Sequence, residues 1–210
     1  YNVDQLAVLA AGISASNYAA RNMSGVRRFP NALPLLEFAL ARIPEGGLVL
    51  EFGVWSGRTI NHIAQQLPAR KVYGFDSFDG LPEDWRAGFT KGVFRRTDLP
   101  PVSNNVELIV GWFDSTLPHF LAQHKSDAVA FLHIDCDLYS STRTVFENLR
   151  FGHIKPGTVI VFDEYFNYPG WEEHEFRAFQ EFVQDASIEY EYIGLVPSHQ
   201  QVAVRIKAVK

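Results

Sequence analysis

The chain has 210 residues, 47% of them hydrophobic and 20% charged, with a formal net charge of −5 at pH 7. This length favours one domain, and the acidic balance argues against a broad basic surface for nucleic acid or for anionic membranes. The single cysteine, Cys136, excludes an internal disulfide and a cysteine-based zinc site. With no visible secretory signal and no apolar run near the roughly 20 residues of a membrane-spanning helix, we expect a cytoplasmic protein.

The first 45 residues predict two helices ahead of the first strand. Residues 3–22 carry large apolar side chains near helical spacing among many alanines, and Asn2 or Asp4 can cap this helix. A basic turn at Arg27-Arg28 leads to a second helix over residues 32–41. Segment 1–45 is therefore either a lid or docking segment, or simply a pair of extra helices that cover the sheet.

From Leu48 onward, strands and helices alternate, which predicts a mostly parallel sheet with helices on both faces. We expect strands at 48–52, 71–76, 106–112, 128–135 and 158–163, and helices at 59–67, 115–123, 141–150 and 171–185. Two last strands, 189–195 and 201–208, are joined by a connection too short for a parallel crossover, so they should be antiparallel. The sequence thus predicts a single α/β, Rossmann-like domain over residues 1–210, with seven strands and an antiparallel C-terminal strand.

A strand that ends in a glycine turn stands at the start of this pattern. The turn runs from Glu51 to Gly57, and Ser56 or Thr59 can cap the helix that follows. Its G-x-x-x-G spacing is neither the G-x-G-x-x-G of dinucleotide sites nor a P-loop. It resembles motif I of class I S-adenosylmethionine (SAM) methyltransferases. The alternative interpretation is an ordinary α/β turn.

The resemblance to motif I implies specific contacts for the residues of the turn. Glycine backbone approaches the methionine part of SAM in such proteins, and a carboxylate near the strand end serves its ammonium group. This implies cofactor-binding roles for residues at and just after the turn: Glu51, Gly53, Val54, Trp55, Ser56, Gly57 and Thr59.

Ligands of open α/β sheets bind beyond the carboxyl ends of the strands, so polar residues there are candidates for a site. Asp76 ends the second strand and can accept both hydroxyls of a ribose. Ser77 can donate to the cofactor, and Phe78 can stack on adenine.

The stretch after the third strand extends the same cofactor site. Gly111 is a predicted cofactor-binding residue of this stretch. Behind it, Trp112 and Phe113 can flank adenine, and Asp114 can accept from its amino group. For the aromatic side chains the competing explanation is ordinary core packing.

Carboxylates that converge at one edge of a sheet repel one another unless a cation absorbs the charge. Asp135 follows the fourth strand, and Asp163 and Glu164 follow the fifth. Neighbouring strands bring these three within reach of one ion, and hard oxygen ligands suit Mg²⁺, or Ca²⁺ or Mn²⁺. Asp135 is also a predicted cofactor-binding residue.

Asp137, two residues past the predicted ligand Asp135, is the candidate general base for an acceptor hydroxyl. The alternative is that Asp137 caps the helix that begins near Ser140 or Ser141. His133, His174 and Tyr139 are further candidate bases, although a histidine inside a strand is more often part of the core.

Taken together, residues 75–82, 111–118 and 134–142 resemble the TylF/macrocin O-methyltransferase family of metal-dependent enzymes that act on sugar hydroxyls of antibiotics. The resemblance covers most of residues 48–182 and implies metal ligation by Asp135, Asp163 and Glu164 and a base at Asp137. Two aspartates are common in that family where this chain has Asp163-Glu164. The aromatic segment 165–171 is expected to wall the acceptor pocket.

The leading hypothesis is a Mg²⁺-dependent SAM O-methyltransferase that acts on a small hydroxylated metabolite. The resemblance implies a sugar moiety of a natural product as the acceptor, and it implies a homodimer as the assembly. The alternative is a degenerate SAM-binding domain of a larger protein, which a sequence beginning at Tyr1 instead of Met allows. An NAD-dependent oxidoreductase would need the missing third glycine. An aminopropyl transferase would need an acidic polyamine site apart from the predicted metal ligands.

Overall fold

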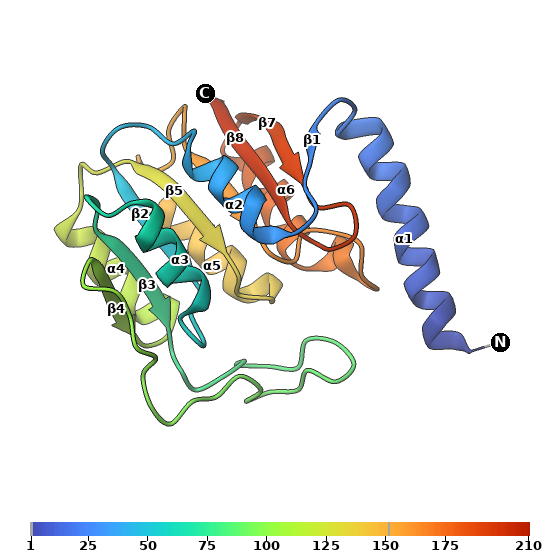
Figure 1. Cartoon of the computed structure of the whole chain (residues 1–210), viewed down its shortest axis with the longest axis horizontal. Coiled ribbons are helices and arrows are strands. Elements are labelled where there is room, and N and C mark those ends of the chain that lie inside the picture. The colour runs from blue at the N-terminus through green and yellow to red at the C-terminus, as the bar shows by residue number, and fades with distance from the viewer. Residues whose placement is uncertain (1, 151) are drawn as a thin grey trace.

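The computed structural model describes residues 2–150 and 152–210, which contain an eight-stranded sheet of order β1-β7-β8-β6-β5-β2-β3-β4 (Figure 1). The strands are β1 (Arg27–Arg28), β2 (Leu48–Phe52), β3 (Val72–Asp76), β4 (Val106–Val110), β5 (Val129–Ile134), β6 (Val159–Phe162), β7 (Ile188–Leu195) and β8 (Val202–Val209). β8 runs antiparallel to both of its neighbours, β6 and β7, and the remaining pairs are parallel. The predicted antiparallel ending and mostly parallel sheet are confirmed.

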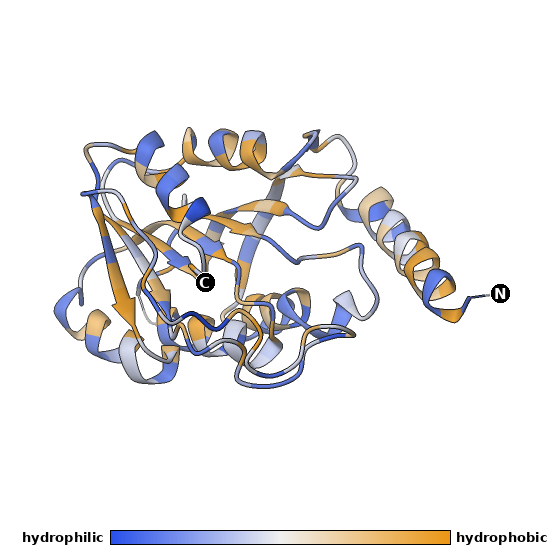
Figure 2. Ribbon diagram, turned by 60° about the horizontal axis from the view of Figure 1, so that its bottom comes forward, coloured by the Kyte–Doolittle hydropathy of each residue, from blue (hydrophilic) through white to orange (hydrophobic). Residues whose placement is uncertain are grey.

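Helices cover both faces of the sheet, as its unbroken apolar strands require. They are α1 (Val3–Asn22), α2 (Ala32–Leu40), α3 (Arg58–Gln66), α4 (Phe113–Gln123), α5 (Tyr139–Leu149), the 3₁₀ turn η1 (Trp171–Glu173) and α6 (Glu175–Asp185). One core cluster joins the sheet to α2 and α3, and the other joins it to α4, α5 and α6. Figure 2 shows apolar colour along much of the strands, and helices in which apolar and polar residues alternate.

The central strands are buried on both faces, which explains why they read as continuous apolar runs. β2, β5 and β6 are buried at every position. Alternate side chains enter opposite clusters: Leu50 faces α4 to α6, and Val49 faces α2 and α3. Each fully buried side chain of this size contributes about 1.5–3 kcal/mol through the hydrophobic effect. The sheet is therefore a rigid support for its loops.

Two local predictions were wrong. The basic turn at Arg27-Arg28 is the short strand β1, parallel to β7, so the sheet has eight strands and not seven. The helix predicted over residues 171–185 is split into η1 and α6, with His174 between them in a non-helical conformation. A two-residue edge strand has too few side chains to show period-2 alternation in the sequence.

Helix α1 lies at one end of the molecule, beyond β1 (Figure 1). Asn2 caps it as predicted, since its side-chain oxygen accepts from the Asp4 amide at 2.9 Å. The helix buries a stripe of small residues, Ala11, Ala15 and Ala19, while Leu9 and others stay exposed. Within residues 2–150 and 152–210, no helix has the length and hydropathy needed to cross a membrane.

Candidate functional site

A cavity of about 1100 Å³ opens at the carboxyl ends of the parallel strands. The residues that follow the parallel strands thus meet at one cavity, as expected. The predicted site residues that line this cavity are Gly53, Val54, Trp55, Ser56, Thr59, Asp76, Ser77, Trp112, Phe113, Asp114, Asp135, Asp137, Asp163 and Glu164.

The glycine turn between β2 and α3 is shaped by close backbone contact. Gly53 has φ 92°, and a Cβ there would overlap the backbone oxygen of Asp135, so this position requires glycine. Gly57, with φ 76°, is the N-cap of α3 and makes no side-chain cap bond. The predicted caps, Ser56 and Thr59, were therefore wrong. The first amides of α3 remain without a side-chain cap at the cavity edge, where the positive end of the helix favours a polar or anionic ligand.

Asp76 organises this turn as well as lining the cavity. Its Oδ2 accepts from the amides of Val54 and Trp55, both at 2.8 Å, and its Oδ1 accepts from the Phe78 amide at 2.7 Å. Trp55 and Phe78 hold left-handed φ angles of 42° and 56°, which cost energy for bulky residues. Charge-assisted hydrogen bonds of this kind offset that cost.

Four predicted cofactor residues do not reach the cavity. Phe78 packs into the core beside α2 and α3, so its predicted stacking on adenine is not supported by its position. Gly111, with φ 139°, forms the tight turn between β4 and α4, where a Cβ would crowd Thr116. Gly57 is the helix cap described above. Glu51 is fully buried behind the cavity wall.

Glu51 faces His133, whose ring does line the cavity. Their closest nitrogen and oxygen are 3.5 Å apart, and both side chains are buried. Burial disfavours the charged form of His133, but the carboxylates of Glu51, Asp135 and Asp163 outweigh it and raise its pKa to about 9. Burial also raises the pKa of Glu51. His133 is therefore a poor free base, because its imidazole is held charged by its neighbours.

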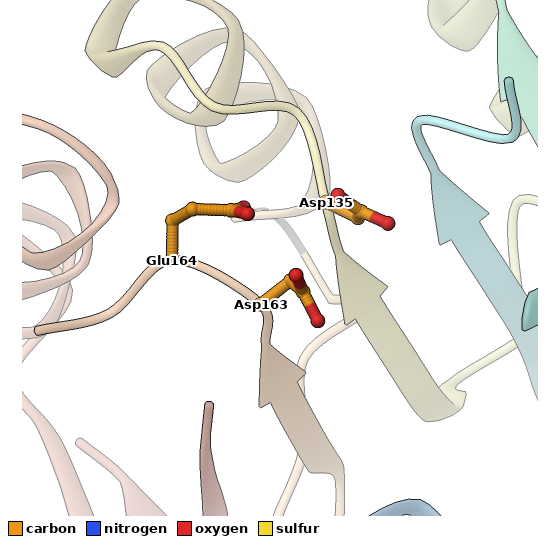
Figure 3. Close-up of side chains that lie close together, drawn as sticks. All are labelled: Asp135, Asp163 and Glu164. Atoms are coloured by element: carbon orange, nitrogen blue, oxygen red, sulfur yellow. The ribbon is translucent and has the colours of Figure 1, made fainter. Parts of the chain in front are cut away.

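Asp135, Asp163 and Glu164 converge as predicted (Figure 3). One carboxylate oxygen from each lies within 4.8 Å of the others. Burial and the charge of Asp163 raise the pKa of both Asp135 and Glu164. One oxygen of Glu164 is buried without a hydrogen-bond partner among the described residues. Three hard oxygens, one of them unsatisfied, fit a divalent cation.

Glu175, which the sequence reasoning missed, links the two loops that carry these carboxylates. It is the first residue of α6 and is fully buried. Its Oε1 accepts from the Cys136 amide at 3.4 Å, and its Oε2 accepts from the Glu164 amide at 3.2 Å. Burial and the charges of Asp137 and Asp163 raise its pKa. No sequence motif indicates this role, because the contacts run between distant segments.

Asp137 lines the cavity beside the three clustered carboxylates and holds a left-handed φ of 63°. It does not cap α5, whose N-cap is Leu138 without a side-chain bond, so the alternative helix-cap role was wrong. Burial, partly countered by Arg86, raises the pKa of Asp137 to about 7. Of the other candidate bases, Tyr139 donates to Glu181 at 2.6 Å, outside the cavity, and His174 does not line it.

The aromatic segment 165–171 does not wall the cavity as predicted. Tyr165, Phe166, Tyr168 and Trp171 are buried in the core instead. The wall comes from the long connection between β3 and β4, through Gly80, Leu81, Pro82, Trp85, Arg86, Phe89 and Phe94. The sequence shows this connection only as an irregular stretch, which does not indicate its tertiary position.

Other wall residues come from segments that the sequence analysis did not assign to the site. Helix α2 contributes Ala32, Leu33 and Leu36, so the N-terminal segment takes part through α2 and not through α1. Arg58 comes from α3, and His199 and Gln201 come from the connection between β7 and β8. Gln201 donates to Asp163 at 3.1 Å.

A family model described as a methyltransferase domain matches residues 50–165, more than half of the chain. The chain belongs to this methyltransferase family. The match starts at Leu50 on β2 and ends just after Glu164, so it contains the glycine turn and the three clustered carboxylates.

Relatives of this methyltransferase chain include a protein named as an O-methyltransferase. The 8-demethyl-8-(2,3-dimethoxy-alpha-L-rhamnosyl)-tetracenomycin-C 4'-O-methyltransferase of Streptomyces olivaceus is 31% identical over 172 residues. That match covers 70% of this chain and 63% of the relative, so the chain spans less than two thirds of the relative's length.

Solved structures confirm the class I methyltransferase fold. CalS11, a calicheamicin methyltransferase, has a TM-score of 0.65 at 24% identity, over 82% of this chain and 76% of its own. MycE, a methyltransferase of the mycinamycin pathway solved in complex with Mg and SAH, has a TM-score of 0.52 at 16% identity, over 83% of this chain and 49% of its own. At these identities the likeness shows the fold alone.

Proposed function

We propose that the chain is a metal-dependent O-methyltransferase that uses SAM to methylate a hydroxyl of a small metabolite, such as a sugar moiety of a natural product. The observation that carries this proposal is one cavity that holds both the glycine turn and the three clustered carboxylates. The named activity of the tetracenomycin relative and the complex of MycE with Mg and SAH agree with it. Within the methyltransferases, we assign the chain to the TylF/macrocin group.

The cofactor site proposed here combines the turn residues with the loops after β3 and β4. Gly53 to Ser56 offer backbone polar groups, Asp76 keeps their shape, and Trp112 and Phe113 present aromatic surface. Gly57, Phe78, Gly111 and Glu51 support the site from behind its wall. SAM supplies the methyl group.

Asp135, Asp163 and Glu164 are the proposed metal ligands. A divalent cation held there supplies charge neutralisation and Lewis acidity toward the acceptor hydroxyl. Asp137 lies beside these ligands on the cavity wall, where its carboxylate can take the hydroxyl proton. The rigid sheet edge holds these groups in place, so positioning contributes much of the rate.

The test is methyl transfer from labelled SAM to a panel of hydroxylated sugars, glycosylated natural products and catechols, with and without EDTA. We expect product with Mg²⁺ and its loss in EDTA, restored by added Mg²⁺. Activity that survives EDTA would show that methyl transfer does not depend on a metal. SAM binding without transfer to any acceptor would instead support the degenerate-domain alternative.

Segment 1–45 is proposed to have two roles. Helix α2 walls the cavity, and α1 is the docking segment of a homodimer, because Leu6, Leu9 and Ile13 remain exposed on it. Sedimentation of the wild type and of Leu9→Asp tests the dimer: a monomeric variant is expected, and a monomeric wild type would contradict it. A cytoplasmic location, with no nucleic-acid or membrane partner, completes the proposal.

A further inference from the structure

Arg86 enters the cavity wall from a tight turn in the connection between β3 and β4. The Trp85 amide donates to the Phe89 carbonyl at 3.0 Å, and the Phe89 amide donates back to the Arg86 carbonyl at 2.8 Å. Gly88 supplies the left-handed residue of this turn, with φ 86°. The Arg86 side chain is therefore presented by a closed hydrogen-bonded turn inside an otherwise irregular loop.

Three aromatic rings surround the guanidinium of Arg86. Its Cζ lies 3.8 Å from the ring centroid of Trp85, 4.7 Å from that of Tyr168 and 5.0 Å from that of Phe89. A guanidinium that lies against aromatic rings can keep N–H donors for a hydrogen-bonding partner. One of these donors, Nη1, makes a long 3.4 Å bond to Gln200, and Nε is buried without a partner among the described residues.

Among the described residues, the charge of Arg86 also lacks an ionic partner. The cavity is lined by the carboxylates Asp76, Asp114, Asp135, Asp137, Asp163 and Glu164. Arg86 nevertheless takes part in none of the ion pairs found within residues 2–150 and 152–210. A partly desolvated cation with an unsatisfied donor is costly unless something pairs with it.

The position of Arg86 relates it to the acceptor end of the cavity. Its charge acts on Asp137, the proposed base, and on His174 and Tyr168 behind the wall. Arg58, the other cationic Arg or Lys side chain of the wall, lies instead at the start of α3 beside the glycine turn. Arg86 therefore lines the same cavity as the proposed base, near enough for its charge to lower the pKa of the Asp137 carboxyl.

We propose that Arg86 binds an oxyanion, a phosphate or a carboxylate, carried by the acceptor close to the hydroxyl that is methylated. This inference rests on the proposed methyl transfer and narrows its acceptor from hydroxylated metabolites to anionic ones. A guanidinium edge pairs with either group through two parallel N–H···O bonds. The aromatic rings around Arg86 keep that edge oriented, so little side-chain entropy is lost on binding.

The first experiment compares acceptors that differ only in charge. Methyl transfer is measured for glucose, glucuronate and glucose 1-phosphate, and for the same three forms of any sugar that the wild type accepts. We expect an anionic form to have a kcat/KM about 10- to 100-fold higher than the neutral form, mostly through KM. The carboxylate and phosphate forms distinguish the two oxyanions. Equal values of kcat/KM for the neutral and anionic forms would overturn the inference.

Three variants make the comparison specific to Arg86. Arg86→Gln should remove the preference for the anionic acceptor, and Arg86→Lys should restore part of it, because a lysine keeps the charge without the two-donor edge. Arg95→Gln is the matched control: it removes the same charge from the same connection, at an exposed residue outside the cavity. Loss of the preference in Arg95→Gln, or its survival in a folded Arg86→Gln, would contradict the proposal.

A binding measurement separates this inference from the proposed activity. In ¹⁵N-labelled protein with EDTA present, the Arg86 Nε–H resonance, identified by its absence in Arg86→Lys, is followed during titration with inorganic phosphate and with acetate. We expect a saturable shift with at least one anion in the wild type and in Arg95→Gln. If neither anion shifts this resonance, the inference about Arg86 is wrong even if methyl transfer occurs. If an anion shifts it but no methyl transfer is detected, the anion site stands and the proposed activity is contradicted.

Discussion

The two ends of the cavity handle negative charge in opposite ways. At the glycine turn, Asp76 is matched by three backbone amides within 2.8 Å of its oxygens. At the ends of β5 and β6, Asp135, Asp163 and Glu164 face one another, and Gln201 is a neutral donor to one of them. The first end is complete as folded, whereas the second holds a mutual repulsion of carboxylates that a bound cation would relieve.

This difference predicts which substitutions lower the stability of the fold and which lower only the catalytic activity. Removal of Asp76 should damage the fold locally and the cofactor site with it, because backbone donors lose their acceptor. Removal of one of the three clustered carboxylates should make the fold more stable and should lower only the catalytic activity. Each prediction below tests this separation, in order of decreasing effect.

Asp163→Asn should lower methyl transfer by about 100-fold or more, because the variant loses a proposed metal ligand. SAM affinity should stay within about twofold of the wild type. In EDTA, its melting temperature should rise, because one of the repelling charges is gone. Activity assays, titration calorimetry and thermal unfolding measure the three effects. Asp185→Asn, at an exposed carboxylate at the end of α6, is the control; a lower melting temperature for Asp163→Asn in EDTA would contradict the comparison.

Asp76→Asn should act in the opposite sense on stability. An amide turns one acceptor oxygen into a donor, so at least one backbone amide of the turn loses its partner, at a cost of about 1–3 kcal/mol in unfolding free energy. SAM affinity should fall about 10- to 100-fold, with Mg²⁺ affinity retained. Denaturant unfolding and calorimetry test this, and Asp98→Asn on the exposed loop serves as reference. Equal losses of SAM and Mg²⁺ binding would show that the two ends are not independent.

Glu175→Gln should weaken Mg²⁺ binding by about tenfold, because Glu175 orients the loops of two proposed ligands without lining the cavity. The amide replaces one of its two acceptor oxygens with a donor. SAM binding should not change. Mg²⁺ titration with and without SAM tests the effect; a Mg²⁺ affinity equal to that of the wild type would show that Glu175 has no positioning role.

The smallest predicted effect concerns the attachment of α1, far from the cavity. Tyr18 shares a hydrogen bond of 2.6 Å with Tyr192, and burial raises the pKa of Tyr18 from 10 to about 12. Its neutral form therefore stabilises the fold fully below pH 10, and this contribution is lost as the pH rises through 12. Tyr18→Phe should cost about 1 kcal/mol at pH 8 and should flatten the fall in stability between pH 10 and 12. Unfolding curves of both proteins across this range give the difference, which includes the effect of Tyr18 on its partner Tyr192; parallel curves would contradict it.

Much of the site could be predicted because its residues are fixed by their place at strand ends. Asp76, Asp135 and Asp163 each follow an apolar run, and parallel strands bring such positions to one edge. Predictions that depended on side-chain direction were less successful. Phe78 and the aromatic segment 165–171 entered the core, because apolar rings gain more from burial than from lining a water-filled cavity.

The sequence by itself determined the alternation of strands and helices from β2 onward, the antiparallel ending and the carboxylates at the strand ends, since hydrophobic period and strand polarity are local properties. Tertiary structure alone decided which loop walls the cavity, that Glu175 bridges the loops after β5 and β6, and that Arg86 is held among aromatic rings with no ionic partner in the described part of the chain. These features depend on contacts between segments far apart in the chain. The physical reason is that packing and desolvation are set by neighbours in space, which a local pattern does not contain.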